Sequence, residues 1–319
     1  DLQPAGFLGR LVTKIHPNEH FPSDIGLWSQ TQTLRYLSLY GWDLPGNLIV
    51  GEPALQLFLA MQQNKNHSPV PVRDRETLYP RLAQEILSYG VPGSSAGGEQ
   101  PKFLAVRQNE SNTTPVLVKF SPPAHDATSI RLADLLICEH IAHEILEESN
   151  QPSARSTLIF ADDRTFLEVE RFDRIQTPHQ RRGVISMRAL DAEFVGRGEG
   201  WREIAQALAD LRIITQEDAE RVIWLESFGD VIANTDMHCG NLAFWINGLT
   251  VEGLTPTYDM TCMRYAPYRG HITHTPLTLR NTDKHRPTDA IKSGLLFWNA
   301  VREHARISTS MQQIASENY

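Results

Sequence analysis

The first 75 residues carry three short apolar patterns separated by turns. Residues 7–12 form a brief apolar run that predicts a strand, whereas apolar positions at helical spacing predict helices over 30–40 and 54–62. The turn-rich residues 43–47 lie between the two helices. We therefore expect an N-terminal subdomain of residues 1–75.

The next segment alternates between helical and strand patterns. Two pairs of alternating apolar runs, each joined by a polar turn, predict two β-hairpins, and an amphipathic helical pattern lies between them. A loop rich in Gly, Ser and Pro precedes the first hairpin. In chain order the patterns are a helix at 75–87, the loop at 88–101, a hairpin at 102–106 and 116–120, a helix at 127–146, and a hairpin at 157–161 and 165–169.

Helical patterns dominate the rest of the chain, at residues 201–211, 216–232 and 289–305. Two hairpins around one helix, followed by a helical region, is the element order of the two-lobed protein kinases. The sequence therefore predicts an α+β, protein-kinase-like fold. We expect a mixed N-lobe with an antiparallel sheet at 76–172, a hinge at 169–173, and a mainly helical C-lobe at 173–319.

Composition restricts the partners and the compartment. With 30 Lys and Arg against 38 Asp and Glu in 319 residues, the formal net charge of -8 gives no general attraction to nucleic acid or anionic membranes. Direct nucleic-acid binding by this chain is therefore not expected. The cysteines, Cys138, Cys239 and Cys262, form no CxxC pair, which favours a reducing, cytoplasmic setting. No apolar stretch is long enough to predict a membrane span.

The strongest chemical signal is the segment 234–241, which reads Asn-Thr-Asp-Met-His-Cys-Gly-Asn. Asp236 and Asn241 have the spacing of the Asp and Asn in the kinase catalytic loop. Phosphoryl transfer needs a carboxylate that orients the attacking hydroxyl and accepts its proton, and an oxygen ligand that holds Mg²⁺ on the phosphates. We assign the first role to Asp236 and the second to Asn241. The same spacing also occurs in solvated loops, so the assignment depends on the surrounding pattern.

A predicted hairpin after this segment supplies a second metal ligand. Apolar runs at 242–246 and 249–251 flank the dipeptide Asn247-Gly248, which favours a two-residue turn. The hairpin would return Tyr258 and Asp259 to the catalytic loop. There Asp259 would bind Mg²⁺, as the Asp of the kinase Asp-Phe-Gly motif does.

Candidate phosphate-binding groups precede these residues in the chain. Lys119 lies in an apolar strand after the Gly-rich loop, as does the kinase lysine that binds the nucleotide phosphates. Its acidic partner is left open between Asp134 and Glu139, both on the following helix. Gly97 and Gly98 in the loop would allow backbone N–H groups to approach a phosphate closely.

Two groups of metal-ligand residue types are interpreted as structural. His140 and His143 are close together on a predicted helix, and His238 adjoins Cys239, but no second pair stands at zinc-site spacing. We expect His238 to support the catalytic loop or to lie near the nucleotide phosphates.

Four blocks of residues resemble the HipA-like serine/threonine protein kinase toxins, including their HipH (YjjJ) branch. The blocks are Ser-Ser-Ala-Gly-Gly-Glu-Gln-Pro-Lys at 94–102, Val-Leu-Val-Lys-Phe at 116–120, Val-Glu-Arg-Phe-Asp-Arg at 169–174, and 234–241 with Tyr258-Asp259. The chain departs from the family pattern twice. Its loop is one residue longer than the usual Ala-Gln-Glu-Lys, and Cys239-Gly240 replaces a pair that ends in lysine.

The resemblance implies an ATP- and Mg²⁺-dependent kinase that phosphorylates a protein Ser or Thr. It further implies a toxin of a toxin–antitoxin system, with a HipB-like DNA-binding antitoxin as partner. Family members also autophosphorylate a serine of the Gly-rich loop, which shuts the kinase off, and Ser94 or Ser95 is the matching position. The implied nucleotide contacts come from the loop, the strand lysine, the hinge and the catalytic segment, namely Ala96, Gly97, Gly98, Lys102, Lys119, Glu170, Arg171, Phe172, His238, Gly240 and Tyr258.

Two other functions fit parts of the pattern. Small-molecule kinases of the aminoglycoside and choline phosphotransferase type carry His-Gly-Asp-Leu-His-Pro-Gly-Asn, which resembles residues 234–241, but Asn234 stands where they have a His. A catalytically silent kinase fold could act as a regulator through a DNA-binding partner. The presence of Asp236, Asn241 and Asp259 argues against the silent form.

Overall fold

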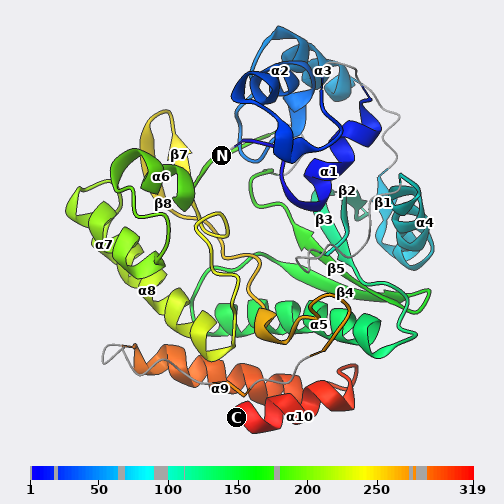
Figure 1. Cartoon of the computed structure of the whole chain (residues 1–319), viewed down its shortest axis with the longest axis vertical. Helices are drawn as coiled ribbons and strands as arrows, with labels where there is room; N and C mark the ends of the chain where they lie inside the picture. Colours follow the sequence, from blue (N-terminus) through cyan, green and yellow to red (C-terminus); the bar gives the residue numbers. More distant parts are fainter. Residues whose placement is uncertain are drawn as a thin grey trace.

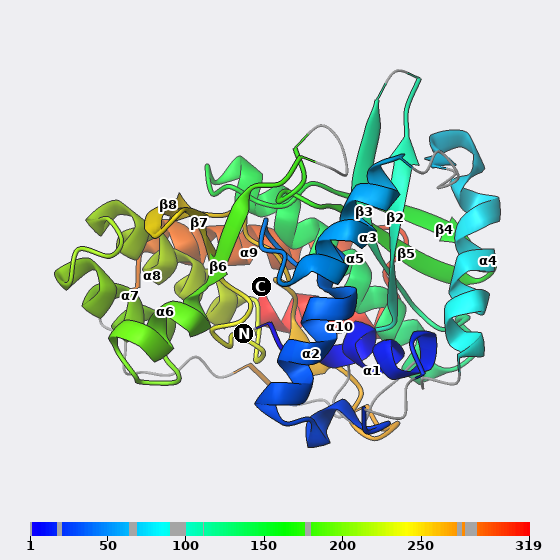
Figure 2. The same ribbon diagram turned by 90° about the horizontal axis from the view of Figure 1, so that it is seen from above.

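The chain folds into an N-terminal helical segment, a lobe built on a sheet, and a helical lobe (Figure 1). The computed structural model describes residues 2–17, 21–63, 69–89, 100–110, 112–175, 180–272, 276–277 and 286–319. Figure 2 shows the N-terminal helices between the larger sheet and the small sheet of the helical lobe. The N-terminal segment touches both lobes, since its first helix contacts the larger sheet and Gly46 lies against Val184 of the helical lobe.

Helices make up the N-terminal segment. They are α1 (Gly6–Ile15), α2 (Gln30–Tyr40) and α3 (Glu52–Gln63), with 3-10 turns at Ile25–Leu27 and Gly41–Asp43. The helices predicted over 30–40 and 54–62 are confirmed. The strand predicted at 7–12 is wrong, because Phe7 and Leu11 are both buried and, four positions apart, lie on one face of a helix.

A five-stranded sheet forms the first lobe. Its order is β1-β2-β3-β5-β4, and every pair is antiparallel except the parallel β1-β2 pair. Both predicted hairpins are confirmed, whereas the short β1 was not predicted. The strands are β1 (Val70–Pro71), β2 (Lys102–Gln108), β3 (Thr113–Phe120), β4 (Ser156–Ala161) and β5 (Arg164–Glu170).

One helix covers each face of this sheet. Successive strand residues point to opposite faces. Phe166 accordingly packs in one cluster with Tyr79 of α4 (Arg75–Ser88), and Leu167 in another with Leu136 of α5 (Ala127–Glu148). Helix α5 also packs into the core of the helical lobe, in the same cluster as α8 (Gln216–Val231) and α9 (Thr288–Glu303). It therefore joins the two lobes beneath the sheet (Figure 1).

The helical lobe carries a small antiparallel sheet of order β6-β7-β8. The strands are β6 (Gly183–Ser186), β7 (Ala243–Asn247) and β8 (Thr250–Leu254), and the helices are α6 (Met187–Phe194), α7 (Trp201–Asp210), α8 (Gln216–Val231), α9 (Thr288–Glu303) and α10 (Thr309–Asn318). The three helices predicted here are confirmed, whereas β6, α6 and α10 were not predicted. The hairpin turn is Gly248-Leu249, one residue later than predicted, because Asn247 pairs with Thr250.

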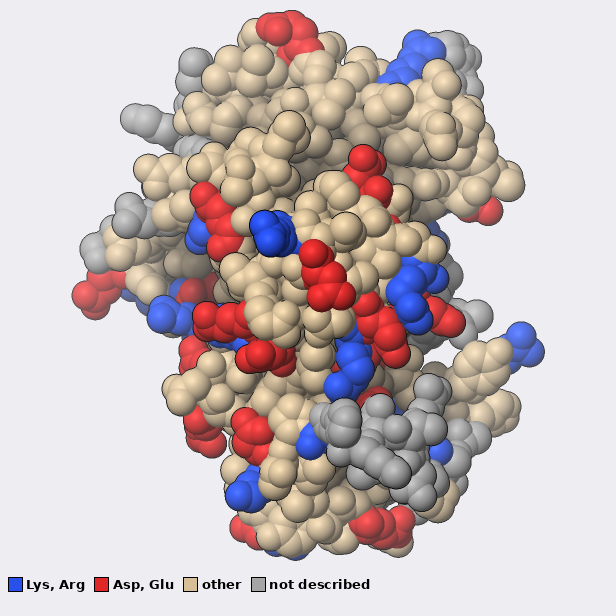
Figure 3. Space-filling model, turned by 90° about the vertical axis from the view of Figure 1, so that its left-hand side faces the viewer, with Lys and Arg blue, Asp and Glu red and all other residues tan. Residues whose placement is uncertain are grey.

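The α+β, two-lobed arrangement is the one expected. All three cysteines are free and buried. None of the helices in the described part of the chain is both long and apolar enough to cross a membrane. On the face drawn in Figure 3, acidic and basic side chains are interspersed rather than gathered into a broad basic patch.

Candidate active site

The residues after α8 form a tight loop that carries the predicted catalytic residues, and we call it the catalytic loop. Asp236 N–H donates to Asn234 Oδ1 (3.0 Å), and Asn241 Nδ2 donates to the Asp236 carbonyl (2.9 Å). His238 N–H donates to the same carbonyl (2.9 Å). Asn241 is buried whereas Asp236 is exposed. The loop is therefore closed by its own backbone and leaves the Asp236 carboxylate accessible.

The imidazole of His238 lies against this loop. Its Nδ1 accepts from the Gly240 N–H (3.1 Å) and is 3.5 Å from Nη2 of Arg188. These contacts agree with the first of the two roles expected for His238, support of the catalytic loop.

Tyr258 ties the end of the β7-β8 hairpin to the catalytic loop. Its hydroxyl donates to the Gly240 carbonyl at 2.9 Å. The next residue, Asp259, adopts a left-handed backbone (φ 54°), which is uncommon for a residue other than glycine. The Asp259 carboxylate forms an ion pair with Lys119 of β3. The hairpin thus connects the catalytic loop to the sheet of the other lobe.

Glu139 is the partner of Lys119. Lys119 Nζ donates to Glu139 Oε1 and Oε2 at 2.7 and 2.9 Å, and both side chains are more than nine-tenths buried. Asp134 instead accepts from the N–H and the hydroxyl of Ser308, at 2.9 and 2.6 Å. Of the two acidic partners that the sequence left open for Lys119, the structure therefore selects Glu139.

The charges of Lys119, Asp259 and Glu139 shift one another's pKa values. Burial alone would lower the pKa of Lys119, but the carboxylates of Asp259 and Glu139 outweigh burial and raise it. Burial would raise the pKa of Asp259, but the charges of Lys119 and Lys102 reverse this and lower it. Burial raises the pKa of Glu139, and Lys119 opposes this rise. Lys119 and Asp259 are consequently both charged at neutral pH.

A cavity of about 390 Å³ opens beside this ion pair. One part of its lining is charged, with Lys102, Lys119, Glu139 and Asp259. Lys102 and Lys119 are direct cross-strand neighbours, so their side chains leave the same face of the sheet. The other part includes the hinge and apolar side chains, namely Leu8, Leu104, Leu117, Val169, Phe172, Val184 and Tyr258.

The structure brings many of the predicted residues to this cavity. Lys102, Lys119, Glu170, Arg171, Phe172, Gly240, Tyr258 and Asp259 line it. Asp236, His238 and Asn241 lie on the adjoining loop. Ser94, Ser95, Ala96, Gly97 and Gly98 lie outside the described residues.

Two hinge side chains contact protein groups rather than standing free in the cavity. Glu170 accepts from Arg107 at 2.6 Å, and Arg171 binds Asp43 and Asp173. The Arg171 N–H donates to the Pro115 carbonyl and the Glu170 N–H to the Arg155 carbonyl. In the described part of the chain the N–H of Phe172 makes no such bond, so the hinge keeps a backbone donor for a ligand.

Sequence reasoning missed the part of the cavity contributed by other elements. Leu8 of α1, Asp43 and Pro45 of the turn after α2, and Val184 of β6 all line it. Pro45 lies within the turn pattern recognised at 43–47, but that pattern carries no signal for a distant contact. Such contacts depend on how the N-terminal helices pack on the lobes.

His140 and His143, two of the other candidate metal ligands, share one hydrogen-bond partner. Nδ1 of His140 and Nδ1 of His143 each lie 2.9 Å from the Ser156 hydroxyl. No group of three or more His, Cys, Asp and Glu side chains in the described ranges is arranged to hold a metal. A carboxylate and an amide oxygen suit Mg²⁺, which completes its shell with water and phosphate oxygens. Asp259 and Asn241 fit that donor set.

Comparison with known proteins identifies the family. The model "HipA-like C-terminal domain" matches residues 94–318, and "YjjJ-like toxin, middle domain" matches residues 1–59. Toxin YjjJ of Escherichia coli (strain K12) is 35% identical over 325 residues, which covers 99% of this chain and 72% of that protein.

A HipA chain in a solved complex shares the fold. The HipA–HipB–operator DNA complex of Shewanella oneidensis MR-1 includes a chain that matches with a TM-score of 0.58 and 16% identity, over 93% of this chain and 80% of that chain. The proinflammatory kinase CtkA of Helicobacter pylori matches with a TM-score of 0.43 and 12% identity, over 67% of this chain and 89% of that chain. By its sequence matches, supported by this shared fold, the chain belongs to the HipA-like family, and its N-terminal residues match the YjjJ-like toxin domain.

Proposed function

We propose that this protein is an ATP- and Mg²⁺-dependent serine/threonine protein kinase that acts as the toxin of a toxin–antitoxin system. Asp236 is the catalytic carboxylate, and Asn241 and Asp259 are the Mg²⁺ ligands. The observation that supports this proposal most strongly is that the Lys119–Glu139 ion pair lines the same cavity as Asp259 and the hinge. In protein kinases, phosphoryl transfer requires that a lysine–glutamate ion pair and a metal-binding aspartate are both in place.

The two parts of the cavity suit the two parts of ATP. The apolar side chains beside the hinge suit adenine, and the Phe172 N–H is available to donate to a ring nitrogen. Lys102 and Lys119 suit the phosphates at the charged part. Asn241 Nδ2 is engaged by the Asp236 carbonyl, which leaves its Oδ1 as a metal ligand. Mg²⁺ would neutralise charge on the β- and γ-phosphates.

Asp236 would act on the protein substrate. Its exposed carboxylate orients a Ser or Thr hydroxyl toward the γ-phosphorus of ATP. The hydroxyl oxygen forms the new P–O bond while the bond from the γ-phosphorus to the β,γ-bridging oxygen breaks, and ADP leaves. The hydroxyl proton passes to Asp236. Lys119 remains on the phosphates through the reaction and is itself held by Glu139.

The autophosphorylation site, the toxin role and the antitoxin partner are proposed from the resemblance to the family and its relatives. We infer that Ser94 or Ser95 is autophosphorylated, because these serines occupy the matching loop position. A phosphate there would add about two negative charges beside the triphosphate site. The toxin role is proposed because the curated relative is named a toxin. A HipB-like DNA-binding antitoxin is proposed as partner because the Shewanella complex holds HipA with HipB and operator DNA.

Mass spectrometry of the purified protein after incubation with ATP and Mg²⁺ tests this proposal. We expect phosphate on a serine within residues 88–102 of the wild type and none on Asp236→Asn. Phosphate found only outside 88–102 would overturn the autophosphorylation site. An unmodified wild type that also transfers no phosphate to added proteins would overturn the kinase assignment.

A further inference from the structure

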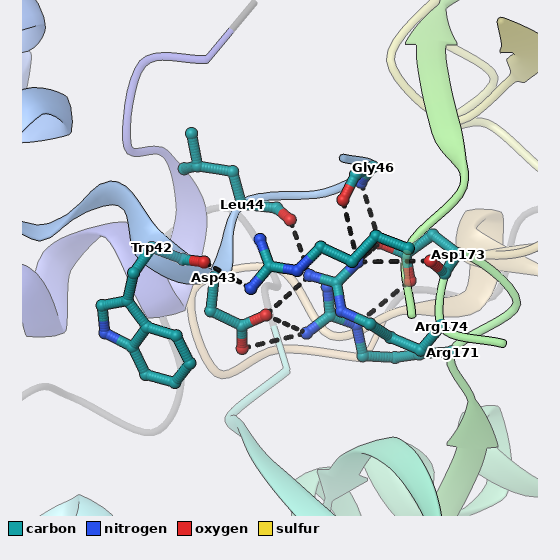
Figure 4. Close-up of polar contacts among 8 residues, drawn as sticks. Trp42, Asp43, Leu44, Gly46, Arg171, Asp173 and Arg174 are labelled. Carbon is teal, nitrogen blue, oxygen red and sulfur yellow. Dashed lines mark hydrogen bonds and ion pairs between the residues drawn. The ribbon is translucent and has the colours of Figure 1, made fainter. Parts of the chain in front are cut away.

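A network of charged side chains joins the N-terminal segment to the hinge (Figure 4). Asp43, in the turn after α2, accepts from Arg171 Nη1 at 2.9 and 3.0 Å and from Arg174 Nη2 at 2.6 Å. Asp173 accepts from the same arginines, at 3.0 Å from Arg171 Nη2 and 2.6 Å from Arg174 Nη1. We call these four side chains the hinge latch.

Backbone groups of the same turn complete the latch. Arg174 also donates to the carbonyls of Leu44 (2.8 Å) and Gly46 (2.9 Å), and the Gly46 N–H donates to Asp173 (2.8 Å). Gly46 has φ +76°, and a Cβ placed there would lie 2.9 Å from the Val184 nitrogen of β6. The turn therefore fits directly against both the hinge and the helical lobe.

The latch is well buried and its charges balance. Arg174 is 1% exposed, Asp173 10%, Arg171 13% and Asp43 24%. Removing one member of a buried ion pair leaves an uncompensated charge, which is strongly unfavourable. A second contact holds the same region, since Arg181 lies over the ring of Phe58 in α3 at 4.3 Å. The N-terminal segment is thus bound to the hinge region by both contacts.

That position brings three N-terminal residues to the nucleotide cavity, namely Asp43 of the latch, Leu8 and Pro45. Leu8 of α1 and Pro45 of the latched turn line the same space as Phe172 and Lys119. Helix α1 reaches the cavity beside the sheet, where Phe7 and Leu11 anchor it in a small cluster against which Leu8 and Ile86 also pack. Pro45 lies between Leu44 and Gly46, whose backbone groups bind the hinge, so it stands at the hinge part of the cavity.

We propose that the N-terminal segment forms one wall of the nucleotide site, with Leu8 and Pro45 contacting the purine base and ribose of the bound nucleotide. The hinge latch sets the position of this wall. The proposal rests on the proposed ATP-binding function and assigns its base-and-sugar contacts partly to residues outside the two lobes. The triphosphate is held elsewhere, by Lys102 and Lys119, and is independent of this wall.

Binding measurements on wall variants test the proposal. The dissociation constant of Mg-ATP is measured by competition with a fluorescent ATP analogue for the wild type, Leu8→Ala and Pro45→Ala. Burial of one methylene corresponds to roughly fourfold in a binding constant. We expect about a tenfold rise for Leu8→Ala, which loses several carbons at one side of the ligand, and roughly threefold to fivefold for Pro45→Ala. Magnesium triphosphate, used as the competitor, should bind both variants as it binds the wild type.

Matched variants separate the wall from general destabilisation. Ile15→Ala removes an exposed apolar side chain of the same helix that does not line the cavity, and it should leave the dissociation constant unchanged. Asp43→Ala should weaken Mg-ATP binding, whereas Glu252→Ala, which removes a half-exposed ion pair with Arg182, should not.

The outcomes distinguish the two proposals. A wild type that binds neither Mg-ATP nor the fluorescent analogue overturns the proposed function. A wild type that binds Mg-ATP, with Leu8→Ala and Pro45→Ala binding it equally tightly, overturns the wall alone. If Leu8→Ala fails to fold, photolabelling of the wild type with 8-azido-ATP decides. Label on a peptide within residues 2–63 supports the wall, and label confined to the two lobes overturns it.

Discussion

Glu139 offers a direct test of the electrostatics of the candidate active site. It accepts two hydrogen bonds from Lys119, and the two side chains are only 5% and 9% exposed. Glu139→Gln keeps the size and one acceptor but removes the charge. A hydrogen bond to a charged group contributes about 1.5–3 kcal/mol, or roughly 10- to 150-fold. We expect kcat/KM for ATP to fall by that range, because Asp259 would then be the only charged partner of Lys119 and would be held away from Mg²⁺.

Asp134→Asn is the matched control. Asp134 lies on the same helix and is equally buried, but it binds Ser308, the N-cap of α10. This variant should lower the free energy of unfolding by about 1–3 kcal/mol and leave kcat/KM nearly unchanged. Initial rates against ATP concentration and urea unfolding curves measure both effects. A larger loss of kcat/KM in Asp134→Asn than in Glu139→Gln would refute the assignment of the lysine partner.

Three further predictions concern pH, the hinge and packing. Burial, together with the charge of Lys119, lowers the pKa of His143 to about 3. Because an unfolded histidine titrates near pH 6.5, the unfolded state binds more protons between the two values, and His143 reduces stability as the pH falls through this window. The wild type should therefore lose more unfolding free energy than His143→Gln when the pH falls from 7.5 to 5.0, by roughly 2 kcal/mol, as measured by urea titrations. An equal loss in the two proteins would contradict a buried neutral imidazole. Lys119→Ala should weaken binding of a fluorescent ATP analogue more than Glu170→Ala does, since a hinge binds adenine through its backbone, and the reverse order would reject the hinge assignment. Gly294→Ala should destabilise the fold by about 1–3 kcal/mol, because its Cβ would lie 2.2 Å from Val231 Cγ1, and an unchanged unfolding midpoint would contradict the α8–α9 packing.

The elements that the sequence predicts well are those with a strong local period. Helix α5 and the β2-β3 and β4-β5 hairpins are encoded by apolar spacing and by polar turns within each segment. The acidic partner of Lys119, in contrast, cannot be predicted from local spacing. Asp134 and Glu139 are five positions apart and so point about 140° apart around their helix, and only the rotation of α5 against the sheet decides between them.

The remaining parts of the site depend on contacts between distant segments. Asp43 and Arg171 are 128 positions apart, and neither position carries a pattern that pairs them. A strand is wrongly predicted at 7–12, where the structure has a helix, because a short apolar segment fits a strand as well as a helix. The apolar pattern of this run also does not predict that Leu8 lies beside Leu104 of β2 and the hinge in the cavity, because that position depends on how α1 packs in three dimensions.

Transfer of labelled γ-phosphate from ATP by the wild type and by Asp236→Asn, with ATP binding measured on the same samples, tests the central claim most directly. Asp236 is exposed, so its substitution should leave the fold intact, and it acts on the hydroxyl rather than on ATP. We predict that Asp236→Asn binds ATP within about threefold of the wild type. Its phosphoryl transfer should fall at least about a thousandfold, or roughly 4 kcal/mol of transition-state stabilisation. Retention of more than about a tenth of the wild-type rate would contradict the account.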